Sequence, residues 1–170
     1  MNNKYYILRH GESEANRLNL IISSPENGIT NYGLTQKGRS QATEAGRRLH
    51  ENGFDSRNTV IFSSDFKRAY ETAQEAAAQI DIDMIYVTPA LRERFFGIYE
   101  KQNASNYELV WALDKKGQTD HSTYVEPVSR IAERALSLIT DCEKWFTGKN
   151  IILVSHGDIL QITLTIAAGR

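Results

Sequence analysis

The sequence predicts an α/β fold built on a mostly parallel sheet. Four short runs rich in β-branched and aromatic residues alternate with longer segments whose apolar residues recur at helical spacing. Strands that are separated by helices form βαβ units, and these units align their strands in parallel. A length of 170 residues suits one domain, so we expect a single domain over 1–170.

The predicted strands are compact apolar runs that end in polar residues. The first run, "YYIL", is expected to be fully buried in the sheet. The others read "TVIFSS", "DMIYV" and "NIILVS". In chain order the four strands are predicted at 5–8, 59–64, 83–87 and 150–155.

The predicted helices carry recognisable ends and apolar stripes. In the segment 34–53, Thr35 is expected to be the N-cap and Gly53 to lie just past the end. The next helix, 65–79, is expected to be capped by Ser64 or Asp65. Two further helices are predicted near 127–146 and at 158–168, and the stretch 19–33 is predicted to be a long surface loop.

Composition excludes several classes of function. The net charge of −1 offers no general basic face, so neither nucleic acid nor a membrane is expected as a partner. Cys142 is the only cysteine, which excludes an internal disulfide and a thiolate metal cluster, and we interpret it as a structural helix residue. The first residues lack the apolar core of a signal peptide and no run approaches transmembrane length, so a cytoplasmic location is expected.

Basic and imidazole side chains follow three of the predicted strands. Arg9 and His10 come directly after the first strand, His156 follows the last, and Arg68 lies one turn into the helix after the second. The carboxyl ends of parallel strands meet at one edge of a sheet, where ligands bind. Guanidinium forks match phosphoryl oxygens, and a neutral imidazole can attack phosphorus. A leaving oxygen also needs a proton, for which Glu93 is the candidate donor.

The motifs resemble those of the histidine phosphatase superfamily, also called the phosphoglycerate mutase-like family. "ILRHGESEAN" resembles its phosphohistidine signature and "ILVSHG" its second histidine block. Between them, "LTQKGRSQA", "SSDFKRAYETA" and "LRERFFGIYE" resemble three further blocks of the family, in the family's order. Together the five blocks span nearly the whole chain.

The resemblance implies a three-layer sandwich, with the central sheet flanked by helices, and a role for each matching residue. His10 would be phosphorylated, and Glu93 would act first as acid and then as the base that activates water. The phosphate pocket would be completed by Arg9, Arg68 and His156, with Asn16 and the backbone of Gly157 as auxiliary binders. The family uses neither a metal nor another cofactor for this chemistry, so none is expected.

Three departures from the family pattern leave the substrate open. Asn31 and Gly33 stand where many members have Asp and Pro, and Lys101 stands where many have Gly. Many relatives continue with a further helix and strand after the second histidine block, so this chain is expected to be a short or trimmed form. Charged candidates for contacts with the rest of the substrate are Arg17, Arg92, Arg94 and Lys101.

The sequence therefore predicts a metal-independent phosphomonoesterase that acts on a phosphorylated small molecule. A phosphoglycerate-type mutase is one alternative, and a phosphatase of phosphohistidine or phosphotyrosine in proteins is another. A phosphate-binding module without turnover is a third, although every catalytic position of the family is filled. The oligomeric state is left open. The aromatic residues of 95–111 are interpreted as packing residues, some of which could instead line a lid over the substrate.

Overall fold

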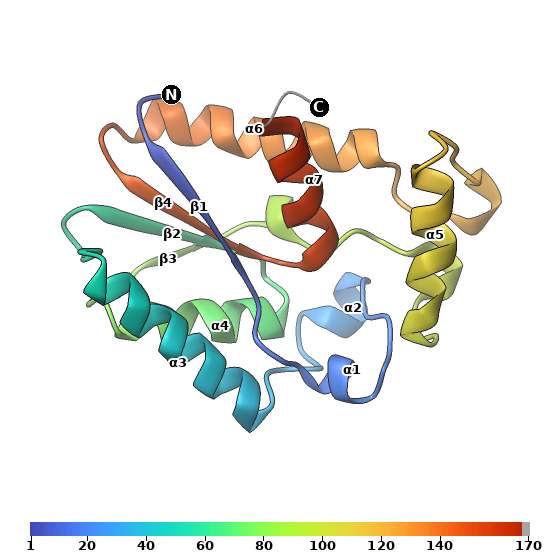
Figure 1. Cartoon of the computed structure of the whole chain (residues 1–170), viewed down its shortest axis with the longest axis horizontal. Helices are drawn as coiled ribbons and strands as arrows, with labels where there is room; N and C mark the ends of the chain where they lie inside the picture. Colours follow the sequence, from blue (N-terminus) through green and yellow to red (C-terminus); the bar gives the residue numbers. More distant parts are fainter. Residues whose placement is uncertain (168–170) are drawn as a thin grey trace.

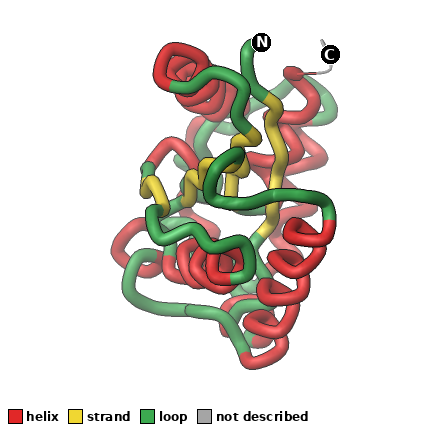
Figure 2. Tube along the Cα trace, turned by 90° about the vertical axis from the view of Figure 1, so that its left-hand side faces the viewer, coloured by secondary structure: helices red, strands yellow, loops and turns green. Residues whose placement is uncertain are grey.

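The computed structural model describes residues 1–167 and confirms the predicted three-layer α/β architecture. Its sheet contains four parallel strands in the order β1-β4-β2-β3. Their bounds are Lys4–Arg9 (β1), Thr59–Ser63 (β2), Ile85–Val87 (β3) and Asn150–Ser155 (β4). In Figure 2 the strands lie in the middle of the molecule, with helices around them.

Two pairs of helices cover the two faces of the sheet (Figure 1). On one face lie α3 (Gln36–Glu51) and α4 (Lys67–Ala78), and on the other lie α6 (Val128–Trp145) and α7 (Gly157–Ala167). Separate apolar clusters fill the two interfaces. One joins α4 to the sheet through Ala69, Ala73, Ala77, Ile61 and Ile152, and the other joins α6 to it through Leu138, Cys142, Phe62, Ile151 and Leu153. Cys142 is thus a buried core residue, as predicted.

Most predicted element ends agree with the structure to within two residues. Thr35 caps α3 by accepting a hydrogen bond from the Gly38 amide, at 3.1 Å, and Gly53 follows the helix with a φ of 81°. The cap predicted for α4 is wrong, because that helix starts at Lys67 after Phe66, which makes no side-chain cap. The last residue of the predicted helix 158–168 lies outside the described residues.

The prediction that the first strand is fully buried is wrong. β1 is an edge strand that pairs only with β4, so one side of it has no neighbouring strand. Tyr6 and Ile7 are accordingly 36% and 39% exposed. The strand predicted at 83–87 is also shorter in the structure, since β3 pairs with β2 only over Ile85–Val87.

Short helices gather beyond the carboxyl ends of the strands (Figure 1). They are α1 (Glu14–Arg17), α2 (Pro25–Gly28) and α5 (Tyr107–Asp114), and the connections between β3 and α6 add four 3-10 turns at 89–91, 97–99, 104–106 and 121–123. The predicted loop 19–33 therefore contains a helix, α2, and α5 was not predicted at all. None of the helices in the described part of the chain is both long and apolar enough to span a membrane.

Candidate active site

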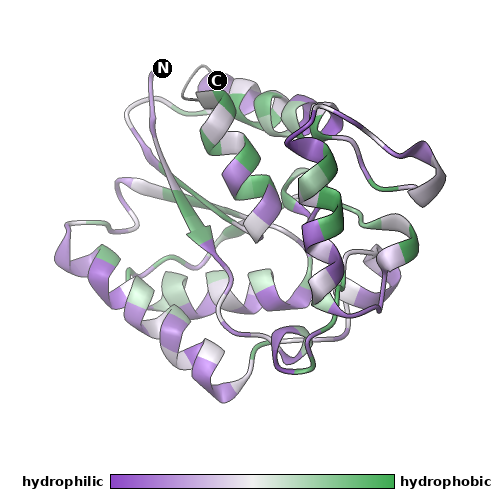
Figure 3. Ribbon diagram, turned by 45° about the vertical axis from the view of Figure 1, so that its right-hand side comes forward, coloured by the Kyte–Doolittle hydropathy of each residue, from purple (hydrophilic) through white to green (hydrophobic). Residues whose placement is uncertain are grey.

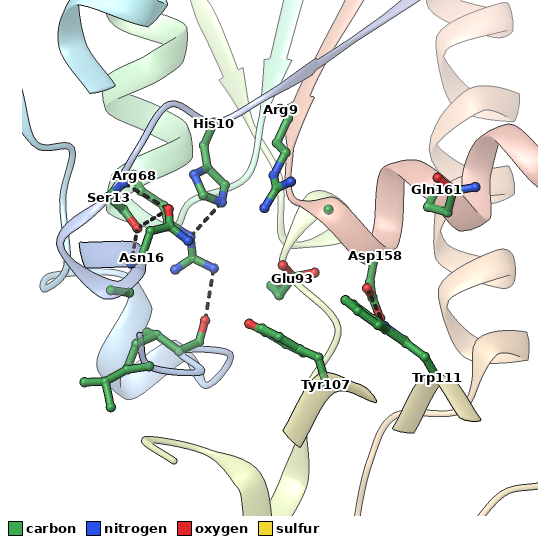
Figure 4. Close-up of a pocket in the computed structure, with 14 residues that line it drawn as sticks. Arg9, His10, Ser13, Asn16, Arg68, Glu93, Tyr107, Trp111, Asp158 and Gln161 are labelled. Atoms are coloured by element: carbon green, nitrogen blue, oxygen red, sulfur yellow. Dashed lines mark hydrogen bonds between the residues drawn. The ribbon is translucent and has the colours of Figure 1, made fainter. Parts of the chain in front are cut away.

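A cavity of about 450 Å³ opens at the carboxyl edge of the sheet, where the strand-end residues meet. Figure 3 shows the hydrophobic run of β1 giving way to hydrophilic chain at this edge. Side chains from four helices and from the loops between the elements close the cavity (Figure 4). Its lining residues are Arg9, His10, Ser13, Ala15, Asn16, Leu20, Ile22, Arg68, Glu93, Tyr107, Trp111, Gly157, Asp158 and Gln161.

His10 presents an unprotonated ring nitrogen to the cavity. Its Nδ1 donates to the Gly11 carbonyl at 2.8 Å, which places the proton on that nitrogen. Its Nε2 accepts a hydrogen bond from Arg68 Nε at 3.2 Å. Burial, and then the positive charge of Arg68, hold the pKa of His10 well below 6.5. His10 is therefore a neutral imidazole at neutral pH, with Nε2 as its nucleophilic atom.

The backbone after β1 is held in place by a close approach to helix α3. A Cβ on Gly11 would lie 2.4 Å from the Gly38 carbonyl oxygen, and a Cβ on Gly38 would lie 2.0 Å from that of Glu12. The Gly11 amide also donates to Thr72 Oγ1 of α4 at 3.1 Å. Only glycine fits both positions, so this contact fixes where His10 leaves the strand.

Arg68 reaches the cavity from the first turn of α4 with part of its fork unused. It is only 4% exposed, and its Nη2 donates to the Ile22 carbonyl at 3.0 Å. Its Nη1 is buried and has no hydrogen-bond partner among the described residues. A buried guanidinium nitrogen without a partner is costly, and an oxyanion in the cavity would satisfy it.

His156 lies behind His10 and is fully buried. The two ring centroids are 5.1 Å apart, and His156 Nε2 is 3.0 Å from Ser64 Oγ. Its Nδ1 has no partner within residues 1–167, and burial followed by the charge of Arg68 keeps its pKa well below 6.5. His156 adjoins the cavity without being one of its lining residues, so its contact with phosphate remains a prediction.

Glu93 is a buried carboxyl group at the centre of the site. The chain before it is fixed by Arg134 of α6, which donates to the carbonyls of Ala90 and Arg92 at 2.6 and 2.8 Å. Burial, reinforced by the negative charge of Asp158, raises the pKa of Glu93 from 4.5 to about 7. A group with this pKa can both donate and accept a proton near neutral pH.

The remaining predicted binders also line the cavity. Arg9 lies beside Gly157, and a Cβ added to Gly157 would be 3.5 Å from the guanidinium carbon of Arg9. Gly157 is the first residue of α7, where free amides and the helix dipole favour an anion. Asn16 Oδ1 accepts from Ser13 N and Oγ at 3.0 and 2.9 Å, which leaves the Asn16 amide nitrogen for the cavity.

The side of the cavity away from His10 was not predicted from the sequence. It is lined by Tyr107 and Trp111 of α5 and by Asp158 and Gln161 of α7. Tyr107 packs against Phe96 and Trp111, as predicted, but it and Trp111 also face the cavity, and a role in a lid stays a prediction. Trp111 Nε1 donates to both oxygens of Asp158, at 3.0 and 3.1 Å.

The four cations predicted to contact the rest of the substrate are not among the lining residues. Arg92 forms an ion pair with Asp65, and Arg94 is buried against Asp114. Arg17 and Lys101 are exposed elsewhere. Within residues 1–167, no group of three or more His, Cys, Asp or Glu side chains is arranged to hold a metal ion.

The site belongs to an α/β protein whose parallel sheet presents two neutral histidines, two arginines and a protonatable glutamate at its carboxyl edge, a set of groups that can bind an oxyanion. The particular family follows from comparison with known proteins. The chain belongs to the histidine phosphatase superfamily (branch 1), whose family model matches residues 5–170.

Relatives of this chain include both phosphatases and mutases. It is 27% identical over 175 residues to a metal-independent phosphoserine phosphatase of Arabidopsis thaliana, covering 96% of this chain and 70% of that protein. It is 38% identical over 110 residues to a 2,3-bisphosphoglycerate-dependent phosphoglycerate mutase of Bartonella henselae, covering 62% of this chain but only 48% of the mutase. A solved phosphoserine phosphatase of Entamoeba histolytica, in complex with 3-phosphoglyceric acid, superposes with a TM-score of 0.73 at 28% identity, covering 95% of this chain and 78% of that one.

Proposed function

We propose that this protein is a metal-independent phosphatase that hydrolyses phosphate monoesters of small molecules through a phosphohistidine on His10. The observation that carries the proposal is a set of unsatisfied groups around one nucleophile. Arg68 Nη1 and His156 Nδ1 are buried without partners in the described chain, next to His10. A phosphoryl group bound there would accept from Arg68 Nη1, and from His156 Nδ1 when Ser64 Oγ donates to the other ring nitrogen, and fixed donors are the main catalytic resource for its transfer.

In the first step, the lone pair of His10 Nε2 attacks phosphorus. The N–P bond forms as the ester P–O bond breaks, and the proton of the Glu93 carboxyl passes to the leaving oxygen. The Arg68 guanidinium, which donates to His10 Nε2 before the reaction, donates to a phosphoryl oxygen instead. Together with Arg9 it balances the negative charge on the phosphoryl oxygens.

In the second step, water releases the phosphate. Ionised Glu93 takes a proton from the water, whose oxygen attacks phosphorus, and the N–P bond breaks to return neutral His10. The pKa of about 7 suits Glu93 to both steps, since it is close to the pH at which the group must lose and regain its proton.

The size of the cavity favours a small molecule over a phosphoprotein. Its volume of about 450 Å³ lies in the range of small-molecule sites. The metal-independent phosphatase among the relatives supports hydrolysis, whereas the likeness to the Bartonella enzyme favours a mutase as the second candidate. A mutase would return the phosphoryl group to a second hydroxyl of the substrate instead of releasing it to water.

Release of inorganic phosphate from phenyl phosphate and from a panel of small phosphate monoesters tests the proposal. We expect turnover that is unchanged by EDTA and reduced at least about a thousandfold in His10→Ala, the scale for loss of a catalytic nucleophile. His50→Ala, an exposed histidine on α3, is the matched control. Turnover that needs an added metal, or that survives in His10→Ala, would refute the mechanism. Conversion of 3-phosphoglycerate to 2-phosphoglycerate without phosphate release would establish the mutase instead.

A further inference from the structure

The cavity has a second end whose chemistry differs from that of the phosphate end. Tyr107 and Trp111 lie one turn apart on α5, with ring planes 9° from parallel and centroids 5.4 Å apart. From the first turns of α7, Asp158 lies against Trp111 and Gln161 also lines the cavity (Figure 4). With phosphorus at His10, the alcohol portion of a substrate would extend toward this end.

Burial raises the pKa of Asp158, whereas hydrogen bonds from Trp111 and Arg94 favour its ionised form, and as a carboxylate its negative charge is only weakly balanced. It accepts two hydrogen bonds from the indole N–H of Trp111, which is neutral. Its one cationic contact among the described residues is Arg94 Nη1, at 3.4 Å. That guanidinium is matched by Asp114, which accepts from Arg94 Nη1 and Nη2 at 2.6 and 3.0 Å.

The charges along the cavity wall show what the distal end can accept. The cationic lining residues are Arg9 and Arg68, and their two charges match one phosphate dianion. Glu93 enters the reaction protonated, so Asp158 is left as the excess negative charge. A second acid on the substrate would therefore face a carboxylate, and like charges in contact reject the wrong partner.

We infer that this distal end selects leaving groups that carry hydrogen-bond donors, such as hydroxyls or an ammonium group, and rejects leaving groups that carry a second acid. The inference rests on the proposed function and narrows it. The substrate class is the phosphate monoesters of polyols and amino alcohols, whose donors meet Asp158 and the side-chain carbonyl of Gln161. The aromatic pair of α5 covers the carbon skeleton of the leaving group.

Two pairs of esters that differ by one carboxylate test the inference. Glycerol 3-phosphate and 3-phosphoglycerate differ only in a hydroxymethyl group against a carboxylate, and phosphoethanolamine and phosphoserine differ only by a carboxylate. We expect kcat/KM to favour the ester without the carboxylate by at least about tenfold in each pair, equivalent to about 1.4 kcal/mol. In Asp158→Asn the preference should shrink to about threefold or less. Asp141→Asn makes the same change of charge on the outer face of α6 and should leave the preference intact.

The ratio within a pair cancels any effect that Asp158 has on the chemistry common to both esters. A ratio near one, a preference for the acid, or a preference that persists in Asp158→Asn would overturn the inference. Phenyl phosphate separates this failure from failure of the proposed function, because its hydrolysis needs no group at the distal end. If phenyl phosphate is not hydrolysed, the proposed function fails, and dissociation constants of the same esters on His10→Ala still decide the selectivity of the distal end.

Discussion

Replacing Glu93 by glutamine should stabilise the folded protein at alkaline pH, although the residue is proposed to be catalytic. Glu93 is 8% exposed, and burial raises its pKa from 4.5 to about 7. Between these two values the folded chain keeps a proton that the unfolded chain has lost. The free energy of unfolding therefore falls as pH rises through this window, and the full cost is present above pH 7.

The magnitude follows from the size of the shift. About two and a half pH units, at about 1.4 kcal/mol per unit, correspond to about 3.5 kcal/mol, of which about 3 kcal/mol falls between pH 4.5 and 8.5 because the unfolded carboxyl is already half ionised at pH 4.5. A glutamine side chain carries no charge at any pH, and its carbonyl can still accept from the Arg94 amide, as Glu93 does at 3.0 Å. The Glu93→Gln variant therefore avoids this cost.

Urea unfolding at pH 4.5, 6 and 8.5 measures the effect as the difference between variant and parent. We expect the difference to grow by about 3 kcal/mol in favour of Glu93→Gln between the lowest and the highest pH. Glu133→Gln, on the exposed side of α6, should give a difference that does not change with pH. A constant difference for Glu93→Gln as well would show that Glu93 is not a buried carboxyl group with a raised pKa.

Three further results follow from the site geometry. For alkyl phosphates, kcat/KM should fall as pH rises through about 7, and Glu93→Gln should lower it by about 10²–10⁴-fold and remove this descending limb, as a pH–rate profile would show. Arg68→Ala should weaken inhibition by vanadate by ~2–4 kcal/mol, and an unchanged inhibition constant would exclude Arg68 from the site. Gly38→Ala should lower both the melting temperature and the activity, because its Cβ would lie 2.0 Å from the Glu12 carbonyl oxygen, whereas Ser40→Ala on the same helix should change neither.

The phosphate end of the site could be predicted because it depends on strand ends. An apolar run followed at once by Arg9 and His10 fixes where those side chains leave the sheet, and parallel strands bring His156 to the same edge. The same kind of run could not show that β1 lies at the edge of the sheet, because strand order is decided by contacts between distant segments.

The distal end could not be predicted, because its chemistry depends on pairings far apart in the sequence. In the sequence "LRERFFG", Arg94 has no evident partner, and only the fold brings Asp114 next to it to neutralise its charge. Asp158 follows the second histidine block, but its orientation is set by the indole of Trp111, 47 residues away. Tyr107 and Trp111 are four residues apart, a spacing that places two side chains on one face of a helix. This spacing is the sequence signal from which α5 could have been predicted.

Trapping the phosphorylated enzyme tests directly whether His10 carries the phosphoryl group during turnover. Glu93→Gln, mixed with a ³²P-labelled aryl phosphate and quenched within milliseconds, should accumulate label, because a good leaving group needs little protonation while attack by water is slowed. The label should be acid-labile and base-stable, should map to the peptide that contains His10, and should be absent in the double variant that also carries His10→Ala. Hydrolysis of the ester with no labelled protein at any quench time, or label on another residue, would show that the phosphoryl group does not pass through His10.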